Sequence, residues 1–228
     1  MTASDARRCR EPAAIEANLA TYLGDRSPTA RYASFDYCYN YFQSYRERDD
    51  VIGIAAPQNL QLSCLQLGFY LASWGMLRGS TDLLQRSVKH LVPLVEAIAH
   101  ASAPMWEVDA DSYSDDTWLI LSDFGRQIRR ALPDATSDIL VTKVMLGVFG
   151  NVPAFDTNFR KGSGLSTYGH GALRRVERFY REHSEVIDRH RVPTLDFATG
   201  AETHRTYSRA KVIDMIFFIE GAPASRAS

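Results

Sequence analysis

Residues 142–156 constrain the fold more than any other stretch of the chain. An apolar run follows Lys143, Gly150 ends it, Pro153 turns the chain, and Asp156 is the only acid of the stretch. Glycine and proline are typical stops of a helix. We predict a helix with the lysine in its first turn, about 10 Å long at 1.5 Å per residue. The turn after it can bring Asp156 back beside that helix.

Helix signals outnumber strand signals in the rest of the chain. The aromatic stretch 32–45 fits either periodicity, and the helical segments beside it favour a helix. Residues 60–74 are apolar nearly all round, which predicts a buried central helix. A long amphipathic helix is expected over 81–98, kinked or split at Pro93. Further helices are expected over 11–23, 115–132, 173–190 and 207–219, with loops at 133–138, 162–171 and 196–205. The prediction is an all-α fold of about eight to ten helices.

Composition sets the domain organisation. With 228 residues, 45% of them hydrophobic and 23% charged, the chain can bury a full core. We expect one helical domain over 12–220, or two closely packed lobes of about 12–104 and 105–220. Residues 1–11 are expected to form a flexible arm and 221–228 a flexible tail. No apolar run approaches the roughly 20 residues that span a bilayer, and the start lacks a signal-peptide core. We therefore expect a soluble, cytoplasmic protein.

Cysteine and histidine usage points to no cofactor. Cys9, Cys38 and Cys64 form no C-x-x-C pair, so neither a disulfide framework nor a zinc site is indicated, and buried packing is the expected role. His183 and His190 lie seven residues apart in a predicted helix. Ordinary core or surface imidazoles are the more frequent meaning of such a pair, so no metal is predicted.

Lys143 and Asp156 are the candidate chemical groups. A partly desolvated lysine loses its charge more readily and becomes a nucleophile, and a nearby carboxylate activates it or a water. This pair suits attack on a sugar carbon while a base departs. The structural alternative makes Lys143 an ordinary solvent-facing residue and Asp156 the N-cap of a helix beginning at Thr157.

The same region resembles a known enzyme family. The residues concerned are Leu132-Pro133, Thr142-Lys143-Val144 and Val152-Pro153-Ala154-Phe155-Asp156. They resemble the helix-hairpin-helix DNA glycosylases, most closely the 8-oxoguanine glycosylase branch, in which Leu-Pro-Gly-Val-Gly-Thr-Lys-Val leads to Val-Pro-Val-Asp. The resemblance implies that Lys143 occupies the family's Schiff-base position and Asp156 its essential aspartate position. It also implies an all-α fold and a DNA substrate. The family's glycine hairpin is absent, and the interval from lysine to aspartate is several residues shorter.

A basic segment follows this region, as DNA binding requires. Residues 158–191 carry eight basic side chains, and a glycine-containing loop at 161–171 offers backbone N–H donors. The candidate DNA-binding residues are Arg160, Lys161, Arg174, Arg178 and Arg181. The alternative is a solvated helix face held by ion pairs such as Glu177 with Arg181.

An extruded base also needs flat walls and polar groups that read it. The candidates combine rings, amides and one guanidinium: Tyr37, Asn40, Tyr41, Gln43, Trp74, Arg78 and Phe155. The alternative is that the rings form core and that the amides satisfy buried backbone groups.

The leading hypothesis is a DNA glycosylase that cleaves the N-glycosidic bond of a flipped, damaged or modified base, in repair or in antiphage defence. Its partner is double-stranded DNA and not a membrane. The first alternative is a non-catalytic helical module that binds nucleic acid or protein. The second is a metal hydrolase that uses His183, His190 or His204. The excised base and the oligomeric state are not indicated.

Overall fold

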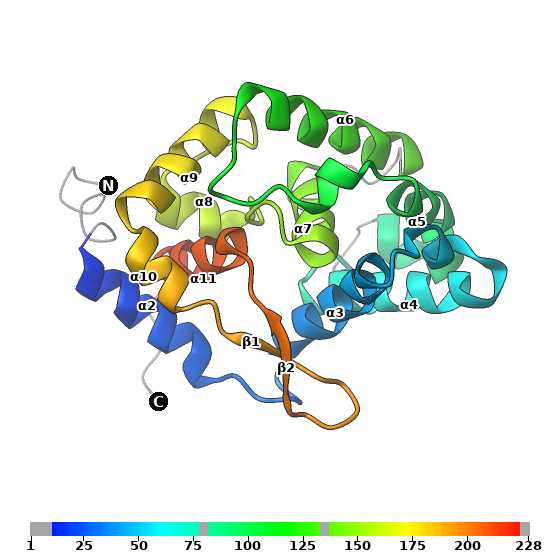
Figure 1. Ribbon diagram of the computed structural model, residues 1–228, viewed down its shortest axis with the longest axis horizontal. Helices are drawn as coiled ribbons and strands as arrows, with labels where there is room; N and C mark the ends of the chain where they lie inside the picture. The colour runs from blue at the N-terminus through cyan, green and yellow to red at the C-terminus, as the bar shows by residue number, and fades with distance from the viewer. Residues whose placement is uncertain (1–10, 78–81, 133–136, 224–228) are drawn as a thin grey trace.

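The computed structural model describes residues 11–77, 82–132 and 137–223. These residues form ten α-helices, a few short 3-10 turns and one two-stranded hairpin (Figure 1). The predicted all-α fold is confirmed. The expected arm 1–11 and tail 221–228 lie mostly outside the described residues, as do Cys9 and Arg78. No helix within the described ranges has the length and apolarity needed to span a membrane.

The helices are joined by connections of very different length, the longest of which carry the 3-10 turns and the hairpin. Their bounds are α2 Pro12–Gly24, α3 Ala33–Glu47, α4 Pro57–Ser73, α5 Val92–Ala99, α6 Asp115–Ala131, α7 Asp138–Phe149, α8 Thr157–Ser163, α9 His170–Glu182, α10 Ser184–Arg189 and α11 Arg209–Gly221. The hairpin consists of β1 (Pro193–Leu195) and β2 (Glu202–Thr206), paired antiparallel between α10 and α11.

Helix α7 lies in the interior of the fold. Every residue from Leu140 to Phe149 is buried. Ser137 caps the helix by accepting the N–H of Leu140. Gly150 ends it with a positive φ of 70°, a conformation that glycine adopts without the Cβ penalty of other residues.

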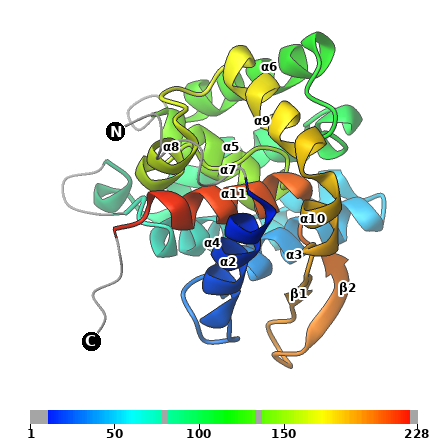
Figure 2. The same cartoon turned by 90° about the vertical axis from the view of Figure 1, so that its left-hand side faces the viewer.

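Helix α11 is the second buried helix, and it lies between α8 and α2 (Figure 2). Two glycines permit the close crossing with α8. A Cβ added to Gly162 would collide with the backbone oxygen of Phe217, and one added to Gly221 would collide with that of Asn158. Because α8 follows Asp156 directly, this crossing fixes the candidate site against α11.

The prediction that residues 60–74 form the central helix was wrong. Helix α4 packs on one side against α3 and α7. It exposes Leu62, Leu65 and Phe69 by 48%, 46% and 68% on the other. A helix with apolar residues on all sides can be buried, but its sequence alone does not require that every side is covered. The helices that are buried along most of their length are α7 and α11.

Three further segments differ from the sequence prediction. The long helix over 81–98 is absent within its described part: 3-10 turns cover Asp82–Gln85 and Val88–Leu91, and α5 begins at Val92. Pro93 lies in the first turn of α5, where its missing N–H costs nothing, so it starts a helix there and does not kink one. His183 divides the predicted helix 173–190 into α9 and α10.

The loop predicted at 196–205 is partly hairpin. Pro193 pairs with Thr206 and Leu195 with Glu202, with an irregularity between them. Strands of three and five residues are too short for their alternation to be distinguished from a polar loop.

Candidate functional site

The structure brings Lys143 and Asp156 together. Lys143 Nζ lies 3.6 Å from Asp156 Oδ2, and the two side chains are 7% and 16% exposed. Lys143 extends from α7, and residues 150–155 reverse the chain so that Asp156 returns beside it. The solvent-facing position that the structural alternative gave Lys143 is excluded by this burial.

Asp156 is also the N-cap of α8. Its Oδ1 accepts the backbone N–H groups of Asn158 and Phe159, both at 3.0 Å. The other oxygen, Oδ2, is the one nearest Lys143. The cap therefore orients the carboxylate and leaves one oxygen for the lysine or for a substrate.

Lys143 has a second partner on α4's C-terminal end. Its Nζ donates a hydrogen bond to the carbonyl oxygen of Trp74 at 2.6 Å. Burial lowers the pKa of Lys143, and the negative charge of Asp156 opposes that shift. The neutral amine that nucleophilic attack requires is thus more accessible than in an exposed lysine.

Two side chains clamp the turn that leads to Asp156. Thr142 Oγ1 accepts the N–H of Phe155 at 2.9 Å. Asp214 Oδ1, from α11, accepts the N–H of Ala154 at 3.0 Å. The backbone just before Asp156 is therefore held by one group from α7 and one from α11.

The sequence analysis missed a second buried ion pair. Lys211 Nζ lies 3.2 Å from Asp214 Oδ2, and their side chains are 1% and 2% exposed. The ammonium sits 4.4 to 4.8 Å from the ring centroids of Tyr22, Phe35 and Trp74, and it donates to the Tyr22 hydroxyl at 2.9 Å. The signal in the sequence was a lysine and an acid three residues apart within an otherwise apolar helix.

Arg31 and Tyr32 border the pair and were also missed. Arg31 is exposed, donates from Nε to the carbonyl oxygen of Ser73 at 2.6 Å, and acts electrostatically on Lys143. The half-buried Tyr32 ring packs 6.1 Å from the Trp74 ring. Burial raises the pKa of the Tyr32 phenol, and the charges of Arg31 and Asp156 act on it as well. A cation and an aromatic ring thus stand beside the Lys143–Asp156 pair.

Among the candidate base-reading residues, Trp74 lies at the pair and the other described ones have partners elsewhere. Their contacts are Tyr37 with Pro28 O, Asn40 with Leu195 O and Thr194, Tyr41 with Ser63, Gln43 with Val148 O, and Phe155 with the Phe159 and Tyr168 rings. This pattern agrees with the structural alternative for the two amides. Arg78 lies outside the described residues.

The candidate DNA-binding residues lie on α8 and α9. The buried carboxylate of Glu177 receives both Arg174, at 2.7 Å, and Arg181, at 2.6 Å. Arg174 also donates to the carbonyl oxygen of Tyr113. These contacts include the ion pair that the solvated-face alternative named. Arg160 donates to Ser166 O, whereas Lys161 and Arg178 are exposed.

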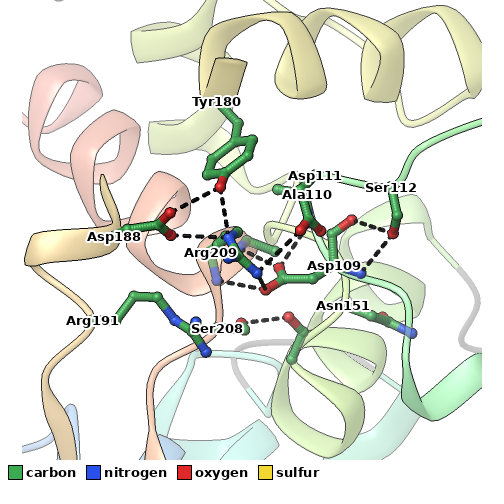
Figure 3. A network of polar contacts seen from close by, with 12 residues as sticks. Asp109, Ala110, Asp111, Ser112, Asn151, Tyr180, Asp188, Arg191, Ser208 and Arg209 are labelled. Atoms are coloured by element: carbon green, nitrogen blue, oxygen red, sulfur yellow. Dashed lines mark hydrogen bonds and ion pairs between the residues drawn. The ribbon is translucent and has the colours of Figure 1, made fainter. Parts of the chain in front are cut away.

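A polar network fixes the beginning of α11 (Figure 3). Both oxygens of Asp109 accept backbone N–H groups there, from Arg209 at 2.9 Å and Ala210 at 2.8 Å. The Arg209 side chain contacts Asp111 at 3.1 Å and Asp188 at 2.9 Å. Burial raises the pKa of Asp109, and these two N–H groups oppose the shift. The network joins residues 109–111 and α10 to the start of α11.

Comparison with protein-family models, with curated proteins and with solved structures gave no match. The described ranges contain no group of three or more histidine, cysteine or acidic side chains that could hold a metal ion. In that part of the chain Cys38 and Cys64 are buried free thiols.

Proposed function

We propose that this protein is a DNA glycosylase that cleaves the N-glycosidic bond of an extruded base at the Lys143–Asp156 pair. The observation that carries the proposal is the 3.6 Å approach of Lys143 Nζ to Asp156 Oδ2. The pair combines a lysine of lowered pKa with a carboxylate that its cap orients. This constellation suits chemistry at a sugar carbon, where positive charge develops as the base leaves.

In the bifunctional version, Lys143 is the nucleophile. Its neutral amine attacks C1′ of the sugar, the electron pair of the glycosidic bond leaves with the base, and the base takes up a proton. The attached amine supplies the proton that the base takes up, and it gives its second proton to the ring oxygen as the bond between C1′ and that oxygen breaks. An imine between Lys143 and C1′ results. For this step Nζ must exchange its hydrogen bond to Trp74 O for the sugar.

In the hydrolytic version, water attacks C1′ and gives up a proton to Asp156, while the electron pair of the glycosidic bond leaves with the base and the base takes up a proton. Asp156 Oδ2 also stabilises the positive charge that develops on the sugar. Lys143 then supplies charge and orientation only. The cap of α8 serves both versions because it holds the carboxylate in one rotamer.

Binding of DNA is proposed around this pair. In this proposal the exposed Arg31 neutralises a phosphate beside the flipped nucleotide, and the half-buried Tyr32 ring supplies aromatic surface for its base. Trp74 is buried and supports the Tyr32 ring from behind. The exposed Lys161 and Arg178 extend the contact along α8 and α9, together with Arg160, Arg174 and Arg181. Damaged bases and the chemically modified bases of phage DNA are the substrates that correspond to a role in repair or in defence.

The test is base release from duplexes that carry a panel of damaged and modified bases, read as alkali-labile abasic sites. Asp156→Asn removes the charge and keeps a side-chain oxygen that can cap α8, so it should abolish release without unfolding the protein. Asp123→Asn is the matched control, because Asp123 is an exposed acid on α6. Release that persists in Asp156→Asn refutes the proposed role of Asp156.

A second assay separates the two versions. Borohydride reduces an imine and links the protein covalently to DNA, so trapping is expected with the native chain in the bifunctional version. Lys143→Met should lose it, whereas Lys89→Met, at an exposed lysine, should keep it. Base release without trapping assigns the hydrolytic version.

The competing candidate is a non-catalytic helical module that binds nucleic acid or a protein. One observation favours it: both members of the pair already have structural partners, the α8 N–H groups for Asp156 and the Trp74 carbonyl for Lys143. A protein that releases no base from any duplex, and in which Asp156→Asn changes only the melting temperature, supports this candidate.

A further inference from the structure

Asp214 makes an unusual contact for a fully buried acid. Its Oδ1 accepts the backbone N–H of Ala154 at 3.0 Å, two residues before Asp156. Its Oδ2 faces Lys211 at 3.2 Å. One carboxylate therefore holds both the turn of the candidate site and a buried ammonium.

The positive charge of Lys211 offsets part of the free-energy cost of burying the Asp214 carboxylate. Burial raises the pKa of Asp214, Lys211 opposes the shift, and Asp156 reinforces it. An isolated buried carboxylate would be protonated or would take up water. The ammonium opposes protonation of Asp214, and the rings of Tyr22, Phe35 and Trp74 surround that ammonium.

The position of Asp214 is itself fixed at two places on α11. The helix start is held by Asp109 and the Arg209 contacts (Figure 3). Farther along the helix, the glycine crossing of Gly162 and Gly221 locks α11 against α8 (Figure 2). Asp214 is therefore held in a fixed position on α11. From there it contacts the turn that connects α7 to α8.

We propose that Asp214, held by Lys211, is a positioning residue for Asp156: its bond to the Ala154 N–H sets the turn so that Asp156 caps α8 and faces Lys143. This inference rests on the proposed function only for its effect on catalysis. The geometric part concerns the turn and the cap, and it can be measured without any substrate. Asp214 itself is buried and touches no reacting atom.

The test compares two double variants of the full chain. Lys211→Met/Asp214→Asn removes the buried charges and keeps a side-chain oxygen for the Ala154 N–H. Lys211→Met/Asp214→Leu removes the charges and that oxygen as well. Amide hydrogen exchange at Ala154, Asn158 and Phe159 reports the turn and the cap. The capped amide of Thr117 at the start of α6 is the internal control.

In the leucine variant the three amides should exchange about tenfold faster than in the asparagine variant, which corresponds to about 1.4 kcal/mol, while Thr117 is unchanged. Base release should fall about 100-fold between the same two variants, in kcat and not in KM, because a displacement of about 1 Å at a catalytic group has that effect. Equal exchange at Asn158 and Phe159 in both variants overturns the positioning role. No release by the native chain would refute the proposed function and leave the exchange result decisive.

A backbone substitution covers the case in which both double variants unfold. Replacing Ala154 by lactic acid during cell-free translation turns its N–H into an ester oxygen and changes no side chain. Faster exchange at Asn158 and Phe159 is again expected. An unchanged cap in the ester protein contradicts the proposal.

Discussion

Substitution of Gly147 tests the packing between α7, which carries Lys143, and Tyr70 of α4. A Cβ built on Gly147 would lie 2.7 Å from Cζ and 2.8 Å from Cδ1 of Tyr70. The Tyr70 ring is fully buried and packs on Phe35 and Trp74. Its hydroxyl donates to the carbonyl oxygen of Lys143 at 3.0 Å. Gly147→Ala must therefore displace a rigid ring that holds α7 against α4.

The magnitude follows from three contributions. Overpacking a filled core costs about 1–3 kcal/mol, and loss of the Tyr70 hydrogen bond costs about 1 kcal/mol. Alanine gains about 1 kcal/mol over glycine in a helix. The expected net loss is about 1–3 kcal/mol, or a fall in Tm of roughly 2–4 °C for each kcal/mol in a chain of this size.

Gly125 on α6 is the matched control. An added Cβ there would meet Val141 at 3.6 Å and Met145 at 3.8 Å, which is ordinary van der Waals contact. Gly125→Ala should therefore raise the Tm through helix propensity, by about 0.5–1 kcal/mol of stability. Differential scanning calorimetry should show a lower Tm for Gly147→Ala and a higher Tm for Gly125→Ala. Equal shifts in the same direction would refute the argued contact between Gly147 and Tyr70.

Three further outcomes are expected. Burial lowers the pKa of Lys143. Imine trapping should therefore rise with pH with a midpoint below 10.5, the ordinary pKa of lysine. A midpoint at or above 10.5 would contradict a pKa lowered by burial. Lys211→Met leaves Asp214 buried without its counter-charge and should cost about 3–5 kcal/mol in urea unfolding, most of which Lys211→Met/Asp214→Asn restores. Asp109→Ala removes two accepted N–H bonds at the start of α11 and should cost about 1–2 kcal/mol; an unchanged urea midpoint would show that these two bonds do not stabilise the fold.

Local signals in the sequence were sufficient to predict where a helix ends when glycine follows it. Gly150 ends α7 as expected, but the helix begins at Asp138, so Lys143 lies in its second turn and not in the predicted first turn. The lysine and acid of 142–156 meet as the turn suggested. The burial of α4 was overestimated, because periodicity reports which residues can be buried and not how many neighbours cover them. Only tertiary packing shows that Phe69 faces outward.

The rest of the site depended on contacts between distant segments. Asp214 bonds the turn at Ala154 across 60 residues of sequence, and a lysine and an acid three residues apart do not by themselves indicate that contact. The roles of Asn40 and Gln43 show the same limit. Their amides bond Leu195 O and Val148 O, whose proximity the local pattern did not encode.

The charge of Asp156 is the centre of the proposed function, and its removal is the most direct test. Single-turnover base release by Asp156→Asn should be compared with that of Asp123→Asn at equal melting temperature. The account predicts that Asp156→Asn forms no abasic sites above background, while its α8 amides keep their protection and Asp123→Asn acts at the native rate. Base release by Asp156→Asn at the native rate would contradict it.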